Sequence, residues 1–407
     1  MTTIVPVAQR AVMIPSTRGT SLPSSPIRGL IPLAAAAKAR GTRVHQLNIG
    51  NPDFAPPPSL TAALGAAHRA RLDYAPTRGL PEAVEAWRVY YRRHGVALEA
   101  DDILVTSGSS EALSLAFLTT CDPGDDILVP DPFYAPYRGI AAVAGLRLVP
   151  VPLGDGFVPP SIEAIRARVT PRTRALLLCS PNNPTGTLWS RDDLAALGAL
   201  AVEAGFFILS DETYREIVLD GPPAPSALAI AGAEEHVVVI DSVSKRFSAP
   251  GLRIGSLVSR NRGVMDAALR VAELRLSAPT IDQLAVVGPL TESRSYIEEV
   301  VAAYRERRDA VVAGLNRIPG VQCHRPPGAF YVVARLPVDD ALDFCAWLLR
   351  DFALRDETVV LTPMTDFYAT PGRGRDEVRI ACVHDVETLT RAVEIVGAGL
   401  AAYPGRV

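Results

Sequence analysis

The sequence predicts an α/β protein in which a mostly parallel, seven-stranded sheet is sandwiched between helices, with a smaller α+β unit beside it. Seven short, β-rich runs alternate with helical stretches between about residues 100 and 260, which is typical of a parallel sheet covered on both faces. After about residue 290 the pattern changes, and a long charged helical stretch precedes further strands and helices. A chain of 407 residues, 48% of them hydrophobic, is long enough for two such units.

The elements are expected in a definite order. The first thirty residues are rich in Pro, Ser and Gly and are expected to form an arm over a neighbouring surface. Strands are expected in the runs 103–108, 126–131, 146–153, 174–180, 206–212, 237–242 and 254–259, with helices at 111–120, 137–145 and 192–205. The second unit is expected to contain a helix at 296–315, a strand at 328–336, a helix at 341–351, a strand at 377–383 and a final helix.

Charge and composition argue against several classes of function. The 41 Lys and Arg residues and 44 Asp and Glu residues give a net charge of −3, and no basic stripe indicates nucleic acid or a membrane as partner. No run is long enough to cross a membrane, and the six histidines lack metal-ligand spacing, so no metal is expected. Scattered cysteines and an N-terminus interrupted by Pro6 and Pro15 favour a cytoplasmic protein over a secreted one.

Ligands of open parallel sheets bind at the carboxyl ends of the strands, so the residues that follow each predicted strand are the candidates. The run 103–108 leads into Ser109 and Ser110 at the start of a helix, where free N–H groups favour an anion, although an ordinary serine cap is the simpler explanation. The run 174–180 leads into PNNPTG, which aims Asn183 or merely makes a turn.

Two further strands end in charged residues. Asp211 ends one strand with Tyr214 three residues on, and Lys245 follows another with Arg253 eight residues beyond, although a capping acid and a surface lysine would explain them separately. Together the four strand ends fit one ligand, a pyridine ring that carries a phosphate, a phenolic oxygen and an aldehyde. The aldehyde needs an amine, the ring nitrogen needs an acid, and the phosphate needs an arginine fork with hydroxyl and N–H donors.

The motifs SPNNPTG, SDETYRE and S-x-S-K-x-F-x-x-x-G-x-R-x-G are specific in combination. Through them, and through LNIGNPDF and TPGRGRDEVRIACV near the two ends, the sequence resembles the fold type I pyridoxal-phosphate enzymes, specifically class I/II aminotransferases of the aspartate aminotransferase kind. The resemblance implies pyridoxal 5′-phosphate as cofactor and a homodimer. It divides the chain into an N-terminal arm (1–30), the N-terminal part of the small domain (31–60), a large cofactor-binding domain (61–290) and a small C-terminal domain (291–407).

The resemblance also implies roles for individual residues. Lys245 is the Schiff-base lysine and proton shuttle, and Asp211 pairs with the pyridinium nitrogen. Tyr214 completes the catalytic set and, with Asn183, hydrogen-bonds the phenolic oxygen. The other implied cofactor contacts are the phosphate ligands Ser109, Ser110, Ser242 and Arg253, the ring-stacking Tyr134, and Tyr74, which reaches the phosphate in the partner subunit. The implied substrate-binding residues are Gly50, Asn183 and Arg379, the last as the clamp on the α-carboxylate.

The implied reaction is a double displacement that moves an α-amino group between an amino acid and a 2-keto acid, as in amino acid metabolism, with aspartate and glutamate as first candidates. The same cofactor grip also serves decarboxylation, elimination or replacement on the side chain, condensation and oxidation, which remain alternatives. A non-catalytic sensor is the remote alternative, because no basic helix-turn-helix segment precedes residue 30. Arg275, Arg373 and Arg375 are candidates for binding a side-chain carboxylate, although solvated loops explain them more simply.

Overall fold

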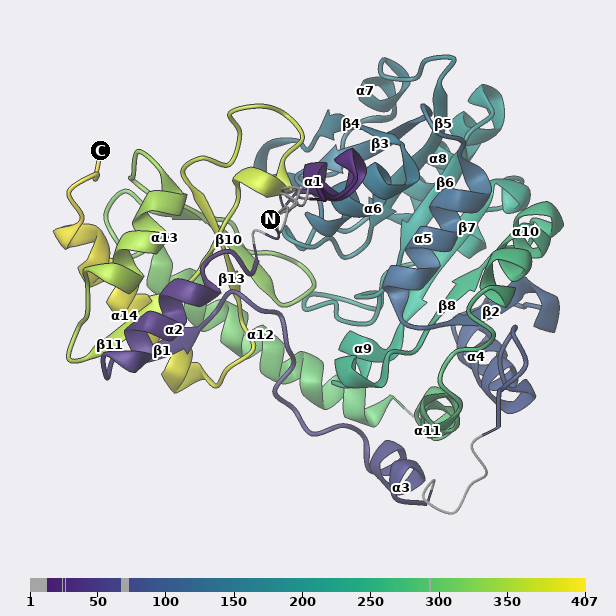
Figure 1. Ribbon diagram of the computed structural model, residues 1–407, viewed down its shortest axis with the longest axis horizontal. Helices are drawn as coiled ribbons and strands as arrows, with labels where there is room; N and C mark the ends of the chain where they lie inside the picture. The colour runs from purple at the N-terminus through teal and green to yellow at the C-terminus, as the bar shows by residue number, and fades with distance from the viewer. Residues whose placement is uncertain (1–12, 24, 26, 67–72, 293) are drawn as a thin grey trace, which may run out of the picture.

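The computed structural model of the chain describes residues 13–23, 25, 27–66, 73–292 and 294–407. Figure 1 shows a larger lobe built around one sheet and a smaller lobe, with the long helix α12 (Ser295–Leu315) running between them. The first twelve residues of the predicted arm lie outside the described residues.

The large sheet has seven strands in the order β2-β8-β7-β6-β5-β3-β4. Among these strands only β8 runs antiparallel to its neighbours, and the other pairs are parallel. The predicted mostly parallel sheet is therefore confirmed, and each predicted run overlaps one of its strands. The bounds of the strands are β2 (Ile103–Thr106), β3 (Asp126–Asp131), β4 (Arg147–Pro152), β5 (Thr173–Cys179), β6 (Phe207–Asp211), β7 (Val237–Ser242) and β8 (Gly255–Val258).

Both faces of this sheet are buried. Successive side chains of a strand point to opposite faces, and each face packs into its own hydrophobic core. Ile103 and Val105 of β2 belong to the core beneath α4 (Pro81–Arg93), α8 (Arg191–Ala204), α11 (Thr280–Thr291) and α12. Leu104, between them, belongs to the core beneath α5 (Ser109–Thr120), α6 (Pro136–Ala144) and α10 (Arg262–Glu273). The helices predicted at 111–120, 137–145 and 192–205 are thereby confirmed.

Local sequence explains where α8 begins and ends. Ser190 and Asp193 form a reciprocal capping box, in which the Ser190 hydroxyl accepts from the Asp193 N–H at 3.0 Å and the Asp193 carboxylate accepts from the Ser190 N–H at 2.8 Å. Gly205, at a φ of 72°, ends the helix in the left-handed conformation that favours glycine. Strand β6 begins two residues later, and its last residue, Asp211, lies at the carboxyl edge of the sheet.

The smaller lobe combines the two ends of the chain. β1 (Arg43–Gln46) pairs in parallel with β11 (Glu357–Val360), and a separate antiparallel sheet has the order β12-β13-β10-β9. The predicted elements after residue 290 are confirmed, whereas the exact domain boundaries at residues 30, 60 and 290 stay a prediction. The remaining bounds are α2 (Ile31–Ala39), β9 (Gln322–Cys323), β10 (Tyr331–Arg335), α13 (Ala341–Arg350), β12 (Thr362–Pro363), β13 (Glu377–Ala381) and α14 (Val386–Ala402).

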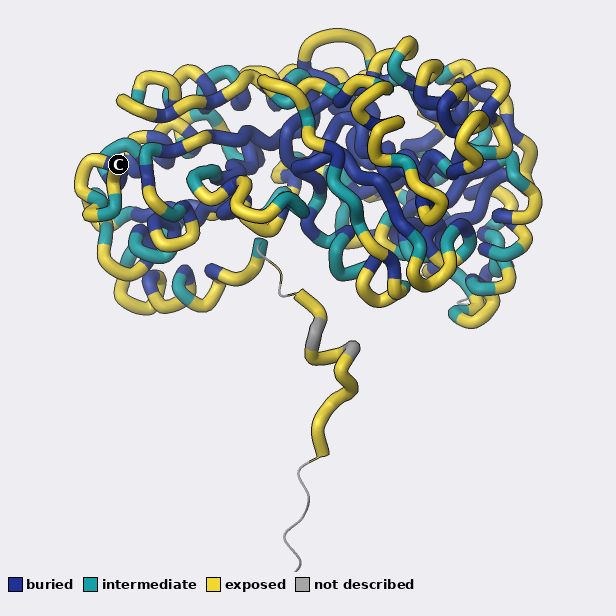
Figure 2. The backbone as a smooth tube through the Cα atoms, turned by 90° about the horizontal axis from the view of Figure 1, so that it is seen from above, coloured by how far each residue is buried: buried dark blue, intermediate teal, exposed yellow. Residues whose placement is uncertain are grey.

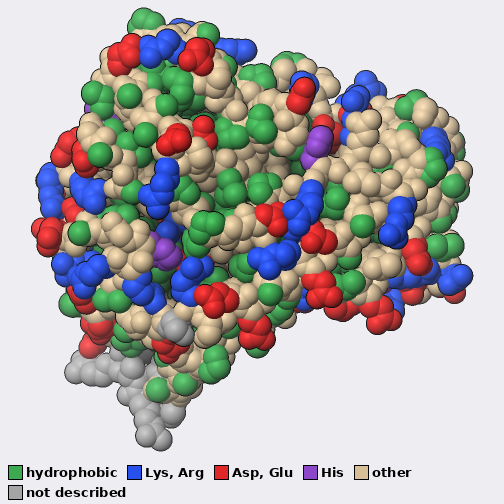
Figure 3. Space-filling view, turned by 180° about the vertical axis from the view of Figure 1, so that it is seen from behind, with side chains coloured by type: hydrophobic (Ala, Val, Ile, Leu, Met, Phe, Trp, Pro, Cys, Tyr) green, Lys and Arg blue, Asp and Glu red, His purple; other side chains and the backbone are tan. Residues whose placement is uncertain are grey.

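Four short helices complete the described chain, namely α1 (Thr17–Ser21), α3 (Pro58–Ala66), α7 (Ile162–Arg166) and α9 (Val243–Arg246). Figure 2 shows the N-terminal segment that contains α1 projecting away from the two lobes, with most of its described residues exposed. Basic and acidic side chains are interspersed on the face in Figure 3. Within the described residues, no helix is both long and apolar enough to span a lipid bilayer.

Candidate active site

A cavity of about 600 Å³ lies where the two lobes meet, at the carboxyl ends of β5, β6 and β7. None of its described lining residues is acidic, whereas Arg28, Lys245, Arg253 and Arg379 are cationic, so the cavity favours anionic ligands. Most of the predicted site residues line it, namely Gly50, Ser109, Ser110, Tyr134, Asn183, Tyr214, Lys245, Arg253 and Arg379.

Lys245 lies in α9, the four-residue helix that directly follows β7. Its amine donates a hydrogen bond of 2.7 Å to the carbonyl oxygen of Gly50, which belongs to the smaller lobe. Burial, and then the positive charges of Arg379 and Arg253, lower the pKa of Lys245 to about 8. About a tenth of the amine is therefore neutral and nucleophilic at pH 7.

A cradle for an anion forms at the start of α5. Gly108 caps this helix at a φ of 81°, and a Cβ atom at Gly108 would lie only 2.5 Å from Nη2 of Arg253. A side chain at this position would push the Arg253 guanidinium out of its present place, and the positive φ by itself favours glycine. Ser109 and Ser110 begin the helix, where the first backbone N–H groups have no helical partner. The guanidinium, these N–H groups and two hydroxyls therefore border the same corner of the cavity.

Asp211 is only 7% exposed and lies at the end of β6, beside the lining residue Thr213. Its carboxylate accepts hydrogen bonds from the Tyr137 hydroxyl at 2.7 Å and from the Thr213 N–H at 3.1 Å. Burial raises the pKa of Asp211, although these hydrogen bonds oppose the rise. A cationic group beside Asp211 would stabilise its charged form.

Arg379 is only 1% exposed, yet its hydrogen bonds go to neutral oxygens. Nη1 donates to the side-chain oxygen of Asn183 at 2.9 Å, and Nη2 donates to the carbonyl oxygen of Asn48 at 2.6 Å. Its guanidinium also lies 4.3 Å from the ring centre of Tyr331. Since Nε has no hydrogen-bond partner among the described residues, the buried cation is preorganised for a carboxylate.

The phenols of the cavity form a second polar group. The hydroxyls of Tyr214 and Tyr331 are 2.9 Å apart. Burial raises the pKa of Tyr214 well above its usual range and raises the pKa of Tyr134 to about 12. Both phenols are therefore neutral and able to donate hydrogen bonds near pH 7.

Three predicted site residues do not line the cavity. Asp211 lies behind it, and Ser242 is buried at the start of α9, where its hydroxyl accepts from the Ser244 N–H at 3.1 Å. Ser244, which lines the cavity, stands where Ser242 was expected. Tyr74 is 81% exposed, so in a single chain it lies at the surface and outside the cavity.

The three arginines suggested for a side-chain carboxylate also lie outside the cavity. Arg275 lies in the turn after α10, partly exposed, where it pairs with Glu111 at 2.6 Å and donates to the Val105 carbonyl at 2.8 Å. Arg375 pairs with Asp340 at 3.3 Å, and Arg373 lies over the ring of Tyr368.

Sequence reasoning missed several residues that the fold brings to the site. Tyr137, which bonds Asp211, lies one helical turn after Tyr134, and this spacing in DPFYAPY could have revealed it. Tyr331 and the N-terminal residues Ser25, Ile27 and Arg28 also line the cavity. The last three lie in SPIRGL, a stretch that also carries the family resemblance, but no role was assigned to them.

A compositional signal for Lys245 was also missed. Of the 41 Lys and Arg residues only Lys38 and Lys245 are lysines, and Lys38 lies exposed on α2. The chain thus has arginine at nearly all of its Lys and Arg positions but has a lysine, with its primary amine, at the cavity. Among the described residues, no group of His, Cys, Asp and Glu side chains could hold a metal ion.

Comparison with known proteins agrees with this arrangement. Residues 42–396 match the family described as "Aminotransferase class I and II". The chain is 33% identical to the aspartate/prephenate aminotransferase of Thermus thermophilus, covering 89% of this chain and 92% of that protein. It is 35% identical to the LL-diaminopimelate aminotransferase of Desulforudis audaxviator, covering 89% and 92% of the two chains.

The solved structures give the same result. The structure titled as aspartate aminotransferase from Thermus thermophilus with maleate superposes with a TM-score of 0.87 at 32% identity, covering 95% of this chain and all of that chain. An alanine aminotransferase from Pyrococcus furiosus superposes with a TM-score of 0.86 at 30% identity, covering 95% and 99%. By sequence and by fold, this chain belongs to the class I and II aminotransferase family of pyridoxal-phosphate-dependent enzymes.

Proposed function

We propose that the chain transfers an α-amino group between an amino acid and a 2-keto acid, with pyridoxal 5′-phosphate held at the cavity between the lobes. One observation carries the proposal. The amine of Lys245, the anion cradle at Gly108–Ser110 and the guanidinium of Arg379 surround one cavity, and the buried Asp211 lies directly behind it.

The residues present fit this cofactor. Arg253 and the start of α5 suit its phosphate, and the Gly108 cradle would be filled by any Cβ atom. Lys245 suits its aldehyde, and Asp211, whose charged form burial disfavours, would gain a cationic partner in the ring nitrogen. When bound, the cofactor supplies an electron sink for the bonds at the substrate Cα.

The residues of the chain then orient the substrate and move one proton. Arg379 would hold the α-carboxylate, with Asn183 and the Asn48 carbonyl fixing the plane of its guanidinium. Such a clamp sets which bond at Cα faces the ring. Lys245, whose amine has a lowered pKa, would remove the proton from Cα and hold it until it is donated to the cofactor carbon beside the ring.

The charge of the cavity supports a substrate with a second carboxylate. Lys245, Arg253 and Arg379 have partners in this account, whereas Arg28 lines the same cavity without one among the described residues. We infer that Arg28 contacts a side-chain carboxylate. The curated relative from Thermus thermophilus is named for aspartate and prephenate, and a solved aspartate aminotransferase from the same organism is described as being with maleate, a dicarboxylate.

The substrate inference is tested by Arg28→Gln. The variant should raise KM for aspartate and glutamate by roughly tenfold, the loss of one charge-assisted hydrogen bond, and leave KM for alanine nearly unchanged. Equal changes for both classes of amino acid would show that Arg28 does not discriminate between them.

The assembly and the location are also part of the proposal. Tyr74 is a large aromatic residue that is 81% exposed, which suits a residue that completes the site of a second copy. A homodimer would also give the projecting N-terminal segment a surface to cover. The five cysteines are all free, which suits the cytoplasm.

Reduction with borohydride tests the cofactor assignment. The purified protein should be yellow, and reduction should fix the cofactor onto the peptide that contains Lys245. Lys38 is the natural control, because it is the only other lysine in the sequence. Recovery of the label on Lys38 alone would refute the proposal, and Lys245→Ala should abolish turnover while the phosphate cradle still retains some cofactor.

A further inference from the structure

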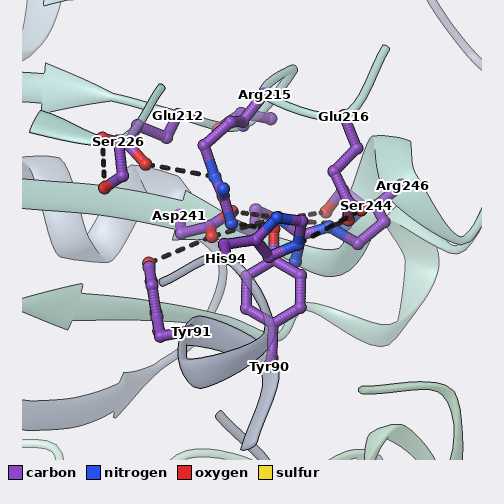
Figure 4. A network of polar contacts seen from close by, with 12 residues as sticks. Tyr90, Tyr91, His94, Glu212, Arg215, Glu216, Ser226, Asp241, Ser244 and Arg246 are labelled. Carbon is purple, nitrogen blue, oxygen red and sulfur yellow. Dashed lines mark hydrogen bonds and ion pairs between the residues drawn. The ribbon is translucent and has the colours of Figure 1, made fainter. Parts of the chain in front are cut away.

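We propose that Arg246 is a positioning residue, which holds the short helix carrying Lys245 in place through a buried polar network behind the cavity. The inference rests on the role proposed above for Lys245. The α9 network comprises Tyr90, Tyr91, His94, Glu212, Arg215, Glu216, Asp241 and Arg246, which Figure 4 shows converging from α4, the segment after β6, β7 and α9.

The helix α9 cannot hold its own shape. It has only four residues, and the Phe247 N–H that follows it bonds the Val243 carbonyl at 3.0 Å. Isolated helices of this length are unstable in water. Ser242 caps the first turn, so contacts at the other end must fix the direction in which Lys245 points.

Arg246 makes the contact at that end. Its Nη2 lies 2.9 and 3.0 Å from the two carboxylate oxygens of Asp241, near the end of β7. Asp241 also accepts from the Tyr91 hydroxyl at 3.1 Å and from the Ser242 N–H at 2.6 Å. The Arg246–Asp241 pair therefore forms a clasp across the turn that contains Lys245.

The other side of the Arg246 guanidinium contacts an acid and an aromatic ring. Nε lies 2.7 Å from Oε2 of Glu216 in an ion pair without hydrogen-bond geometry, and the group lies 4.0 Å from the ring centre of Tyr90. Glu216 is in turn 3.0 Å from Arg294. Because Arg246 and its two acidic partners are almost fully buried, water does not replace these contacts, and the hydrogen bonds of Nη2 to Asp241 hold the guanidinium.

The same network reaches the segment that carries Asp211. Glu212, the next residue, pairs with Arg215 at 3.2 Å. Arg215 donates to the hydroxyl of Tyr90, over whose ring Arg246 lies. Asp211 directly precedes Glu212, and Lys245 directly precedes Arg246, so the α9 network holds the residue next to each of them. The network thereby fixes the distance between the segments that carry Asp211 and Lys245.

Arg246 acts through position and not through charge. The positive charges that lower the pKa of Lys245 come from Arg379 and Arg253, and Arg246 is not among these causes. Its own charge is balanced by Asp241 and Glu216. A change in the reactivity of Lys245 on altering Arg246 would therefore report a change in its position or hydration.

The test is the pH dependence with which acetic anhydride labels Lys245 in the cofactor-free protein, followed by tandem mass spectrometry that assigns each acetyl group to a single residue, with Lys38 as internal reference. The wild-type midpoint should lie near 8. Arg246→Lys keeps the positive charge but loses the planar guanidinium that contacts both carboxylate oxygens of Asp241. Water then reaches the amine of Lys245, and its labelling midpoint should rise by about one pH unit. Asp241→Asn weakens the same clasp from the strand and should raise the midpoint too, which covers a failure of Arg246→Lys to fold.

Arg308→Lys is the matched control. Arg308 is as buried as Arg246, and its Nη1 and Nη2 lie 2.6 and 3.2 Å from the two carboxylate oxygens of Asp220. This control should lower the melting temperature similarly and leave the Lys245 midpoint unchanged. An unchanged midpoint in folded Arg246→Lys would overturn the inference. Borohydride label on Lys38 in the wild type would instead refute the proposed function, so the two failures are distinguishable.

Discussion

Gly50 carries no side chain at the point where a backbone carbonyl meets the amine of Lys245. A Cβ atom there would lie 1.8 Å from the hydroxyl of Tyr331 and 2.6 Å from its Cζ. Tyr331 in turn contacts Tyr214 and the guanidinium of Arg379. Glycine at position 50 therefore lets the smaller lobe bring the phenol and the clamp to the cavity.

Gly50→Ala should consequently displace Tyr331 and disturb Arg379. Overpacking of this kind costs about 1–3 kcal/mol, and we expect amino-acid use to fall at least about tenfold because the clamp must be placed accurately. Stopped-flow rates and melting temperature measure the two effects. Gly139→Ala in α6 is the control, since a Cβ atom there meets nothing within 4 Å. A rate as high as in this control would refute the packing argument.

At the scale of elements, the α9 network makes stability depend on pH. Burial by itself raises the pKa of Glu216, but the hydrogen bond with His94 and the charges of Arg246 and Arg215 outweigh it and hold the pKa far below its usual range. A carboxyl group with a depressed pKa in the folded state stabilises the protein above its unfolded pKa. As the pH falls, the unfolded chain binds a proton that the folded protein excludes, and this stability is lost.

Glu216→Gln should therefore be less stable at pH 7, by about 3–5 kcal/mol for breaking a buried pair. Its free energy of unfolding should also fall less steeply than that of the wild type between about pH 5 and pH 3. Urea unfolding at several pH values gives both quantities. Glu203→Gln removes an exposed partner of Arg166 and should change little. Parallel pH profiles for the wild type and Glu216→Gln would contradict the assignment.

The sequence indicated the elements of the large lobe because each strand is a short apolar run and helical stretches alternate with these runs, with side-chain caps at the start of α8 and α10. The strand ends then located Asn183, Asp211 and Lys245, since parallel strands deliver their next residues to one edge. Ser242 shows the limit of this reasoning. Its hydroxyl caps α9 and donates to the hydroxyl of Ser244 at 2.9 Å, and Ser244 is the serine of the pair that lines the cavity.

At the scale of the whole molecule, the site depends on contacts between lobes that local patterns do not encode. Tyr331 reaches Tyr214, which is 117 residues earlier, and Arg379 reaches Asn183, which is 196 residues earlier. The register of β10 against β13 places Tyr331 and Arg379 on neighbouring strands of the smaller lobe. The motif EVRIACV indicated Arg379 by family resemblance, whereas neither Tyr331 nor Arg28 was assigned a role.

The proposed homodimer predicts complementation between two defective subunits. Tyr74→Ala and Lys245→Ala should each be impaired, the first because Tyr74 serves the site of the partner. In a hybrid dimer one site receives Lys245 from one chain and Tyr74 from the other, so refolding an equal mixture should restore roughly a quarter of the sites. Sedimentation should show dimers. A fully active monomer, or a mixture no more active than the separate variants, would contradict this assembly.

The half-reaction tests the central claim most directly. The yellow enzyme is mixed with aspartate, glutamate and other α-amino acids without any keto acid, and absorbance and released product are followed. We predict conversion of the cofactor to its aminated form with one keto acid released per site, and return of the yellow form when 2-oxoglutarate is added. If no amino acid gives the aminated cofactor, and a substrate with a leaving group on its side chain gives an eliminated or coupled product instead, the enzyme is not an aminotransferase.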